Sequence, residues 1–379
     1  MADPTFDQLS ASTLADLAQD IVYDEFFVEG SLQRKLRASG ALDEYLGGTI
    51  MQEPFQYNRV AGGAIAPGSD VTVVQRQILA ATGFTPKLYV EQVPLNLWQT
   101  NVVNSGPAAR VKLADLYMSN AVQALNTDLG IDFYRHGQAA PSGVGDNRVV
   151  FINGAAEAMN DGVTNSWDGN YFTYYGGQLR NGTIGNVLNS IPIWFGDQLG
   201  NTGQISYKSI VEMYLNCVQA PDIAVCNKAL YSYLLERQEP KQNFSQEKDV
   251  SIGITGLKFL ESYIHVDKLC PSTKYGQILP SGLSQTTAIQ PSSFTSSGSP
   301  SSISNLPATQ TINPGEVIFF FRTAGWKIRP TTDEEYNFNF TPPIRSQTNP
   351  DLIVMFLKAG INFYTPSPRD NVHGYGAGF

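Results

Sequence analysis

Apolar positions recur every three or four residues between positions 106 and 137, which predicts one long amphipathic helix. Amide and charged side chains fill the opposite face, and the apolar stripe comprises Val111, Ala114, Met118, Val122, Leu125, Leu129 and Phe133. Gly106 and Pro107 predict its beginning and Gly137 its end, because proline is tolerated in a first turn and glycine favours a helix C-terminus. At about 1.5 Å per residue such a helix is a rod of roughly 45 Å, much longer than the usual globular helix.

Alternating apolar and polar residues predict β-structure before this helix. The alternation begins near Phe55, is interrupted by a stretch with several glycines, Ala61–Asp70, and resumes at Val71 and in LYVEQVPLNLW, residues 88–98. This pattern predicts a long β-hairpin followed by a return strand. Because an isolated two-stranded hairpin is marginally stable in water, we expect it to dock on its own body or on another subunit.

The remaining pattern predicts short helices and strands. The acidic, amphipathic residues 1–30 and the following stretch SLQRKLRASGALDEYLGG, residues 31–48, predict an N-terminal arm of short helices. Loops rich in Gly and Asn dominate residues 139–200. A helix, a short strand and a second helix are predicted over 205–240, followed by paired strands over 256–266. EVIFFFRT, residues 316–323, predicts a buried strand, and long strands are predicted from Trp326 to Tyr364. Between residues 272 and 315 the composition changes to Ser, Thr, Pro, Gln and Gly, which predicts an exposed insertion.

Composition and charge narrow the class of protein. The chain has 379 residues, of which 42% are hydrophobic, and its 25 Lys and Arg against 34 Asp and Glu give a net charge of −9. Proteins that bind nucleic acid over a broad surface are usually basic, so sequence-specific DNA binding is not expected. We find no signal peptide and no apolar run that could span a bilayer, which favours a cytosolic origin.

Residue patterns for catalysis or metal binding are sparse. The three histidines are His136, His265 and His373, and the three cysteines, none in a CxxC pair, are Cys217, Cys226 and Cys270. His265 and Asp267 would share one face of a strand and could form an acid–base or ligand pair, although a buried structural histidine is the favoured interpretation. Asp333–Glu335 could hold a cation, although a solvated turn is favoured. We therefore expect no enzyme and assign no catalytic, cofactor-binding or metal-binding residue and no cofactor.

The order of the predicted elements resembles the major capsid proteins of tailed bacteriophages, which have the Hong Kong ninety-seven type of fold. Three parts of the sequence carry the similarity together with that order: FTPKLYVEQVPLNLW, YGGQLRNGTIGNVLNSIPIWFG, and APDIAVCNKALYSYLLERQEPKQNFS followed by GLKFLESYIHVD. The resemblance extends from about residue 25 to the C-terminus, and no single motif is diagnostic. The Ser- and Thr-rich residues 276–313 depart from the family pattern and resemble an insertion.

The resemblance implies an α+β fold. Its parts would be an N-terminal arm (1–45), an extended loop formed by a β-hairpin and its return strand (46–105), the spine helix of a peripheral domain (106–138), an axial α/β domain (139–325) with the insertion 272–315, and C-terminal β-strands of the peripheral domain (326–379). The N-terminal arm and the extended loop would contact neighbouring subunits.

The resemblance also implies a function. The chain would assemble as pentamers and hexamers into an icosahedral virion shell in the bacterial host cytoplasm, enclosing double-stranded DNA without reading its sequence. Its partners would be copies of itself together with scaffolding, portal and decoration proteins, and no membrane. Two alternatives remain at this point: a β-rich surface or carbohydrate-binding module, and an encapsulin-type compartment shell with the same fold.

Overall fold

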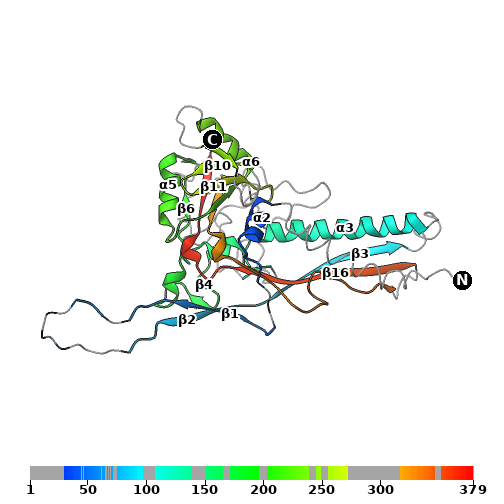
Figure 1. Cartoon of the computed structure of the whole chain (residues 1–379), viewed down its shortest axis with the longest axis horizontal. Helices are drawn as coiled ribbons and strands as arrows, with labels where there is room; N and C mark the ends of the chain where they lie inside the picture. Colours follow the sequence, from blue (N-terminus) through cyan, green and yellow to red (C-terminus); the bar gives the residue numbers. More distant parts are fainter. Residues whose placement is uncertain are drawn as a thin grey trace, which may run out of the picture.

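Two projections leave a central body in opposite directions (Figure 1). One projection, which we call the arm and which is distinct from the expected N-terminal arm, is formed by the helix α3 (Pro107–Asp132) and the strands β3 (Lys87–Asn96) and β16 (Leu352–Tyr364). The other projection is the hairpin, formed by β1 (Met51–Gln56) and β2 (Leu79–Phe84). The computed structural model describes residues 30–43, 45, 47–60, 62–64, 66, 68, 70, 75–96, 107–138, 151–164, 171–195, 203–238, 245–248, 255–271, 316–345 and 351–378. The predicted short helices of residues 1–29, the strand at Val71 and the insertion 272–315 lie outside these residues.

The long helix predicted from the sequence is present as α3 and ends at Asp132 rather than at Gly137. Met118, Val122, Leu125 and Leu129 are buried, as the apolar stripe predicts. The helix ends early because the chain turns there to meet the segment that follows: the amide of Ala155 donates to the carbonyl of Phe133 at 2.7 Å. A Cβ at Gly137 would lie only 2.6 Å from the carbonyl oxygen of Phe151. Gly137 therefore permits a close approach of two chain segments instead of capping the helix.

The arm is a sheet with one covered and one open face. β3 and β16 pair antiparallel over ten residues, from Lys87 opposite Ile361 to Asn96 opposite Leu352. The other edge of β16 pairs with β13 (Lys327–Pro330), β14 (Asn339–Phe340) and β15 (Ile344–Arg345). Val93 and Leu95 are buried on the face that α3 covers, while Leu88 and Val90 are exposed on the opposite face. This is the alternation expected of a strand that is buried on one side.

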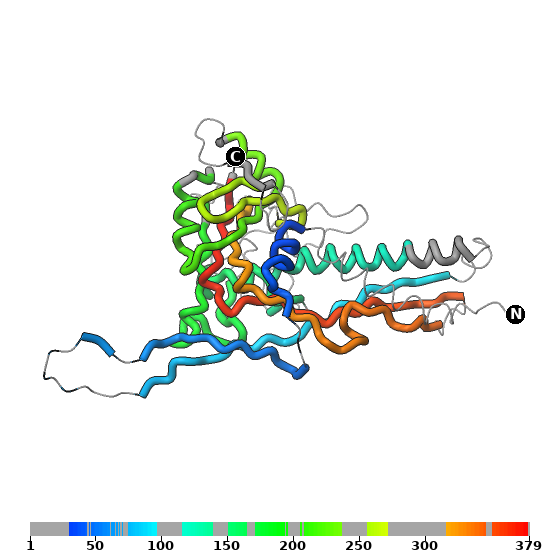
Figure 2. Tube along the Cα trace, viewed as in Figure 1, coloured from blue at the N-terminus to red at the C-terminus, as the bar shows by residue number. Residues whose placement is uncertain are grey.

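A hairpin and the predicted return strand β3 are present, but the second strand of the hairpin is β2 at Leu79–Phe84, where the sequence pattern predicts no strand, and the strand predicted at Val71 lies outside the described residues. β1 and β2 pair antiparallel from Met51 opposite Phe84 to Gln56 opposite Leu79, and β3 follows directly. In the tube view the hairpin, in blue, extends to the opposite side of the body from the arm (Figure 2).

The body is built on a second sheet of eight strands with the order β6-β17-β12-β8-β11-β10-β9, in which β7 also pairs with β17. Its strands are β6 (Ile193–Trp194), β7 (Gly203–Gln204), β8 (Ile223–Cys226), β9 (Ser245–Lys248), β10 (Thr255–Phe259), β11 (Ser262–Val266), β12 (Glu316–Phe321) and β17 (Val372–Gly378). β8, β12 and the β10–β11 pair lie where the sequence predicts strands. Every residue of β8 and β12 is buried.

Both faces of this sheet are covered, which explains the continuous apolar runs of β8 and β12. The predicted helices α5 (Tyr207–Asn216) and α6 (Lys228–Gln238) pack on one face, against side chains that include Ala224 and Phe320. The opposite face, which includes Val225 and Phe319, packs in a larger core with α2 (Ser31–Ala38), α4 (Ala155–Ala158) and the end of α3.

Residues 326–379 are divided between the two sheets. β13 and β16 belong to the arm, whereas β17 lies between β12 and β6 in the body. The expectation that the whole segment belongs with the arm strands therefore does not hold for Val372–Gly378. Its sequence, VHGYGAG, contains three glycines and lacks a dense apolar pattern, yet residues 372–377 are buried in the body.

Candidate assembly surfaces

The base of the hairpin is firmly packed against the body. The ring of Phe84 stacks on Tyr364 with centroids 4.3 Å apart and meets Tyr175 edge-on at 5.2 Å. The turn between β4 (Tyr174–Tyr175) and β5 (Gln178–Leu179) holds the edge of β2, because the amide of Gly83 donates to the carbonyl of Gly176 at 2.9 Å. Glycine is required at position 176, where φ is +53° and a Cβ would lie 2.6 Å from Thr82.

A fully buried arginine organises the segment behind this turn. Arg180 donates to the carbonyl oxygens of Asn160 at 2.5 Å, Glu157 at 2.6 Å and Ala158 at 3.2 Å, and also to that of Leu188. Burial lowers the pKa of its guanidinium to about 10, so it remains charged at neutral pH. One side chain thus ties α4 and the helix η2 (Gly185–Leu188) to the turn that supports the hairpin.

An ion-pair network joins the hairpin base to the arm. The buried carboxylate of Glu53, in β1, accepts hydrogen bonds from Lys327 at 2.9 Å and from the hydroxyl of Tyr364 at 3.0 Å. Arg329 lies 2.9 Å from the same carboxylate and 2.7 Å from Asp43. Hydrogen bonds to ionised groups are short and directional, so this network fixes geometry as well as adding stability.

Beyond its base the hairpin presents apolar and cationic side chains to solvent. Val60 is 72% exposed and Leu79 is 55% exposed. Arg59 and Arg76 are exposed in the same part of the chain, and Asp70 is the only acidic residue between positions 57 and 78. The stretch of the hairpin between β1 and β2, residues 57–78, therefore carries a small positive charge on a molecule whose net charge is negative.

The open face of the arm is also apolar, but it carries acidic side chains where the hairpin carries cationic ones. Leu88, Val90 and Ile344 are 55%, 43% and 56% exposed there. An acidic turn, Asp333–Glu335, lies beside them and is exposed. The turn is held over this face by Lys358, which donates to Glu335 and lies 4.9 Å from the ring of Tyr336. The turn is thus exposed and anchored, as the solvated interpretation of Asp333–Glu335 predicts.

Carboxyl groups occupy the contact between α3 and β3. The hydroxyl of Tyr89 donates to Asp132 at 2.8 Å, and Arg135 pairs with the same carboxylate at 3.0 Å. One helical turn further along, Glu91 and Asp128 share a hydrogen bond. Burial and the neighbouring Asp128 raise the pKa of Glu91 to about 7, and burial raises the pKa of Asp132 to about 6 against the opposing effect of Arg135. Glu91 is therefore partly protonated at neutral pH.

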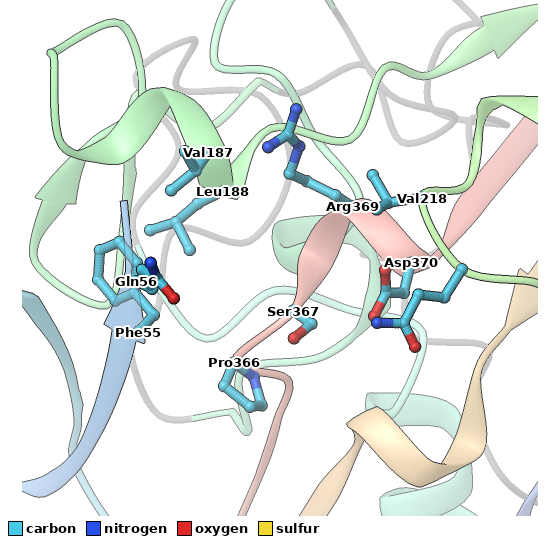
Figure 3. Close-up of a pocket in the computed structure, with 10 residues that line it drawn as sticks. Phe55, Gln56, Val187, Leu188, Val218, Pro366, Ser367, Arg369 and Asp370 are labelled. Atoms are coloured by element: carbon cyan, nitrogen blue, oxygen red, sulfur yellow. The ribbon is translucent and has the colours of Figure 1, made fainter. Parts of the chain in front are cut away.

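A cavity of about 210 Å³ lies where the hairpin meets the body (Figure 3). It is lined from β1 by Phe55 and Gln56, and from the body by the end of η2, the chain after α5 and the helix η6 (Pro368–Asp370). Arg369 and Asp370 are the only charged side chains in its lining, and Asp370 pairs with Arg322 at 3.1 Å. The lining offers no group of residues suited to nucleophilic or acid–base chemistry.

The histidines and Asp267, which the sequence singled out for possible chemistry, lie in the packed core. His136, His265 and His373 are all buried, and Asp267 accepts hydrogen bonds from the hydroxyl of Tyr134 at 3.0 Å and the amide of Leu269 at 2.9 Å. Asp267 thus helps to anchor the core. Within the described part of the chain, no group of three or more His, Cys, Asp and Glu side chains is arranged to hold a metal ion.

The cysteines are unsuited to nucleophilic chemistry. Cys226 and Cys270 are buried, and burial raises the pKa of both thiols, while that of the half-buried Cys217 is raised to about 12. These thiols remain protonated at neutral pH and pack as small apolar side chains. Among the described residues, no helix is both long enough and apolar enough to cross a membrane.

Comparison with solved structures identifies the fold. The chain aligns with the capsid asymmetric unit of cyanophage A-1(L) over 91% of its own length and 93% of that chain, with a TM-score of 0.59 and 10% identity. It also aligns with the capsid of an empty GTA particle over 90% of its length and 89% of that chain, with a TM-score of 0.50 and 8% identity. No family model matches the chain, and no curated protein matches its sequence. The chain therefore has the α+β fold of bacteriophage capsid proteins, and the resemblance inferred from the sequence is confirmed at the level of the fold.

Proposed function

We propose that this chain is the major capsid protein of a tailed bacteriophage, a shell subunit rather than an enzyme. The observation that carries the proposal is the fold match to a phage capsid chain over about nine-tenths of both chains. In this function the subunit assembles as pentamers and hexamers into an icosahedral virion shell in the host cytoplasm and encloses double-stranded DNA. Scaffolding, portal and decoration proteins are its further partners.

The same proposal assigns roles to the parts of the chain. Residues 1–45 form the N-terminal arm, 46–105 the extended loop, 106–138 the spine helix, 139–325 the axial domain, and 326–379 return to the peripheral domain except for β17. A projecting hairpin and a helix-backed arm suit a shell because each can bury apolar surface only against another subunit.

The surfaces described above support one arrangement of neighbours. The exposed face of the arm combines apolar Leu88 and Val90 with the acidic turn Asp333–Glu335, and the hairpin combines apolar Val60 with Arg59 and Arg76. Complementary charge sets the orientation of such contacts and suppresses incorrect ones. We place the hairpin of one subunit over the open face of the arm of the next.

Electron microscopy of the purified protein, alone and with a co-expressed scaffolding protein, tests the proposal. We expect closed icosahedral shells or capsomers with fivefold and sixfold symmetry. Nuclease-protected DNA in particles from infected cells would support a virus, whereas an enclosed protein cargo would indicate a compartment shell. A strictly monomeric protein that binds glycans would favour the surface-module alternative.

Deleting residues 61–70, at the tip of the hairpin, tests the role of the projection. The base of the hairpin is anchored independently by Glu53 and Phe84, so the variant should fold with the melting temperature of the wild type but fail to form stable shells. Deleting ten residues from the Ser- and Thr-rich insertion, 291–300, is the matched control and should leave assembly unchanged. Normal shells from the hairpin deletion would contradict the proposed role of the projecting tip.

A further inference from the structure

Glu53 lies where three parts of the chain meet that are far apart in sequence. It belongs to the hairpin, while its partners Lys327 and Tyr364 come from β13 and β16, 274 and 311 residues later. The Glu53 carboxylate is one negative charge between the two cations of Lys327 and Arg329, and its side chain is only 8% exposed. A carboxylate in such a position makes directional contacts that cannot be replaced by neighbouring apolar side chains.

Arg329 extends this network to the N-terminal segment. Its guanidinium contacts Glu53 at 2.9 Å and Asp43 at 2.7 Å, so one side chain bridges two acidic partners. The segment around Asp43 runs parallel to β13: the amide of Asp43 donates to the carbonyl of Ile328 at 3.0 Å, and the amide of Tyr45 donates to that of Pro330 at 2.9 Å. Arg329 is thus the residue of β13 that both Glu53 and Asp43 contact, while the backbone of its neighbours Ile328 and Pro330 holds the segment 41–45.

The amide of Gly83 in β2 donates to the carbonyl of Gly176, but the other contacts of β1 leave the direction of that strand less strictly determined. Met51 and Phe55 are buried on the same face of β1 as Glu53. Apolar burial stabilises the base but is non-directional, and small rotations of the hairpin preserve it. The ion pairs are sensitive to such rotations because hydrogen bonds weaken steeply when donor and acceptor are misaligned.

We propose that Glu53 is a positioning residue: through Lys327 and Arg329 it fixes the direction of the hairpin and couples it to the N-terminal segment 41–45. The hairpin and the segment 41–45 then move together instead of independently. The proposed function assigns contacts with neighbouring subunits to both of them. A contact made by the N-terminal segment restricts the hairpin, and a contact made by the hairpin restricts the N-terminal segment. The coupling is a property of the single subunit, and only its consequence for shells rests on the proposed function.

A distance measurement in the unassembled full-length subunit tests whether Glu53 fixes the direction of the hairpin. Spin labels are attached through Gln75→Cys on the hairpin and Ser232→Cys on α6, both exposed, with Cys217→Ser removing the half-buried native thiol. In Glu53→Gln we expect the distribution of label–label distances to broaden, because the neutral amide leaves Lys327 without its counter-charge and Arg329 paired with Asp43 alone. An unchanged distribution would overturn the proposal whether or not the protein forms shells.

The control is a second ion pair of almost the same burial. Lys327 and Glu53 are 31% and 8% exposed, and Arg322 and Asp370 are 31% and 6% exposed, but Asp370 does not bridge to the N-terminal segment. Glu53→Gln and Asp370→Asn should lower the melting temperature by similar amounts, and only Glu53→Gln should broaden the distances. In shells we expect Glu53→Gln to reduce the yield roughly tenfold and Asp370→Asn to leave it unchanged. Equal loss of yield in both variants would show that stability, rather than positioning, is responsible.

If the wild-type protein forms no shells under any condition, the proposed function fails while the distance measurement still decides the role of Glu53. Lys327→Met provides a second variant should Glu53→Gln not fold, since it removes one cation and leaves Glu53 paired with Arg329. A partial broadening is then expected, and distances as narrow as those of the wild type would contradict the proposal.

Discussion

Replacing Glu91 with glutamine should make the protein more stable at neutral pH, and the gain should depend on pH. Glu91 faces Asp128 across the contact between α3 and β3, and burial together with this neighbour raises the pKa of Glu91 from its ordinary value of 4.5 to about 7. Among the described side chains, Asp132 and Arg135 pair with each other at 3.0 Å further along this contact, and Lys87 lies at the start of β3 on the same face as Glu91. Glutamine retains a hydrogen-bond donor towards Asp128 but cannot acquire a second negative charge.

The sign and size of the effect follow from proton linkage. A raised pKa means that the folded state binds the proton more tightly, so the stability associated with Glu91 is complete below about pH 4.5 and is lost as the pH rises through about 7. The shift corresponds to an upper limit of about 3.4 kcal/mol. Because Glu91 is half-buried, solvent screening reduces the expected effect to about 1–2 kcal/mol.

Urea unfolding of the wild type and of Glu91→Gln between about pH 5 and pH 8 measures this effect. The difference in unfolding free energy should be small at the lower pH, grow towards neutrality, and level off above pH 7. Glu335→Gln is the control, since its carboxylate contacts Lys358 on the open face of the same sheet. A Glu91→Gln variant that is less stable than the wild type at pH 8, or a difference that does not change with pH, would refute the reasoning.

Two further predictions concern the hairpin and its support. Arg180→Met removes the donor to four carbonyl groups and should lower the unfolding free energy by at least about 3 kcal/mol. Arg345→Met, at an exposed position, is the control and should change the unfolding free energy very little. Equal melting temperatures of the two variants would contradict the structural role of Arg180. Combining Arg59→Glu with Arg76→Glu should reduce the shell yield seen by electron microscopy, and adding Asp333→Lys with Glu334→Lys to that chain should restore it. Failure of the second pair to restore shells would exclude the proposed pairing of hairpin and arm.

The elements that could be predicted from the sequence are those whose burial is regular. The stripe containing Met118 and Leu129 predicts α3 because one face of a long helix must be covered, and the continuous run in EVIFFFRT predicts β12 because both faces of its sheet are buried. The return strand β3 is signalled by the alternation in LYVEQVPLNLW, whereas the sequence LAATGF of β2 does not alternate and is not predicted. For the predicted elements the information is local, so neighbouring residues suffice to specify the element.

Features that depend on long-range contacts could not be predicted in this way. The sequence gives no indication that Glu53 meets Tyr364, since these residues are 311 positions apart. β17 could not be predicted from the sequence for a related reason. Its glycines allow close packing against distant residues, as at Gly374, where a Cβ would lie 2.5 Å from Phe195. The carboxyl pair of Glu91 and Asp128 is likewise formed only when α3 lies on β3. Contacts between residues that are far apart in sequence can be identified only from the folded structure.

One strand connects the two projections. β16 pairs with β3 along the arm, and its last residue, Tyr364, stacks on Phe84 of the hairpin and donates to Glu53. Closely packed elements rearrange as units rather than deforming continuously, so a change in the direction of the hairpin must displace the end of β16 or break its contacts. In the proposed shell the arm receives one neighbour and the hairpin reaches another. A continuous strand between them allows the contact on one side of a subunit to influence the contact on the other, which is a physical basis for cooperative assembly.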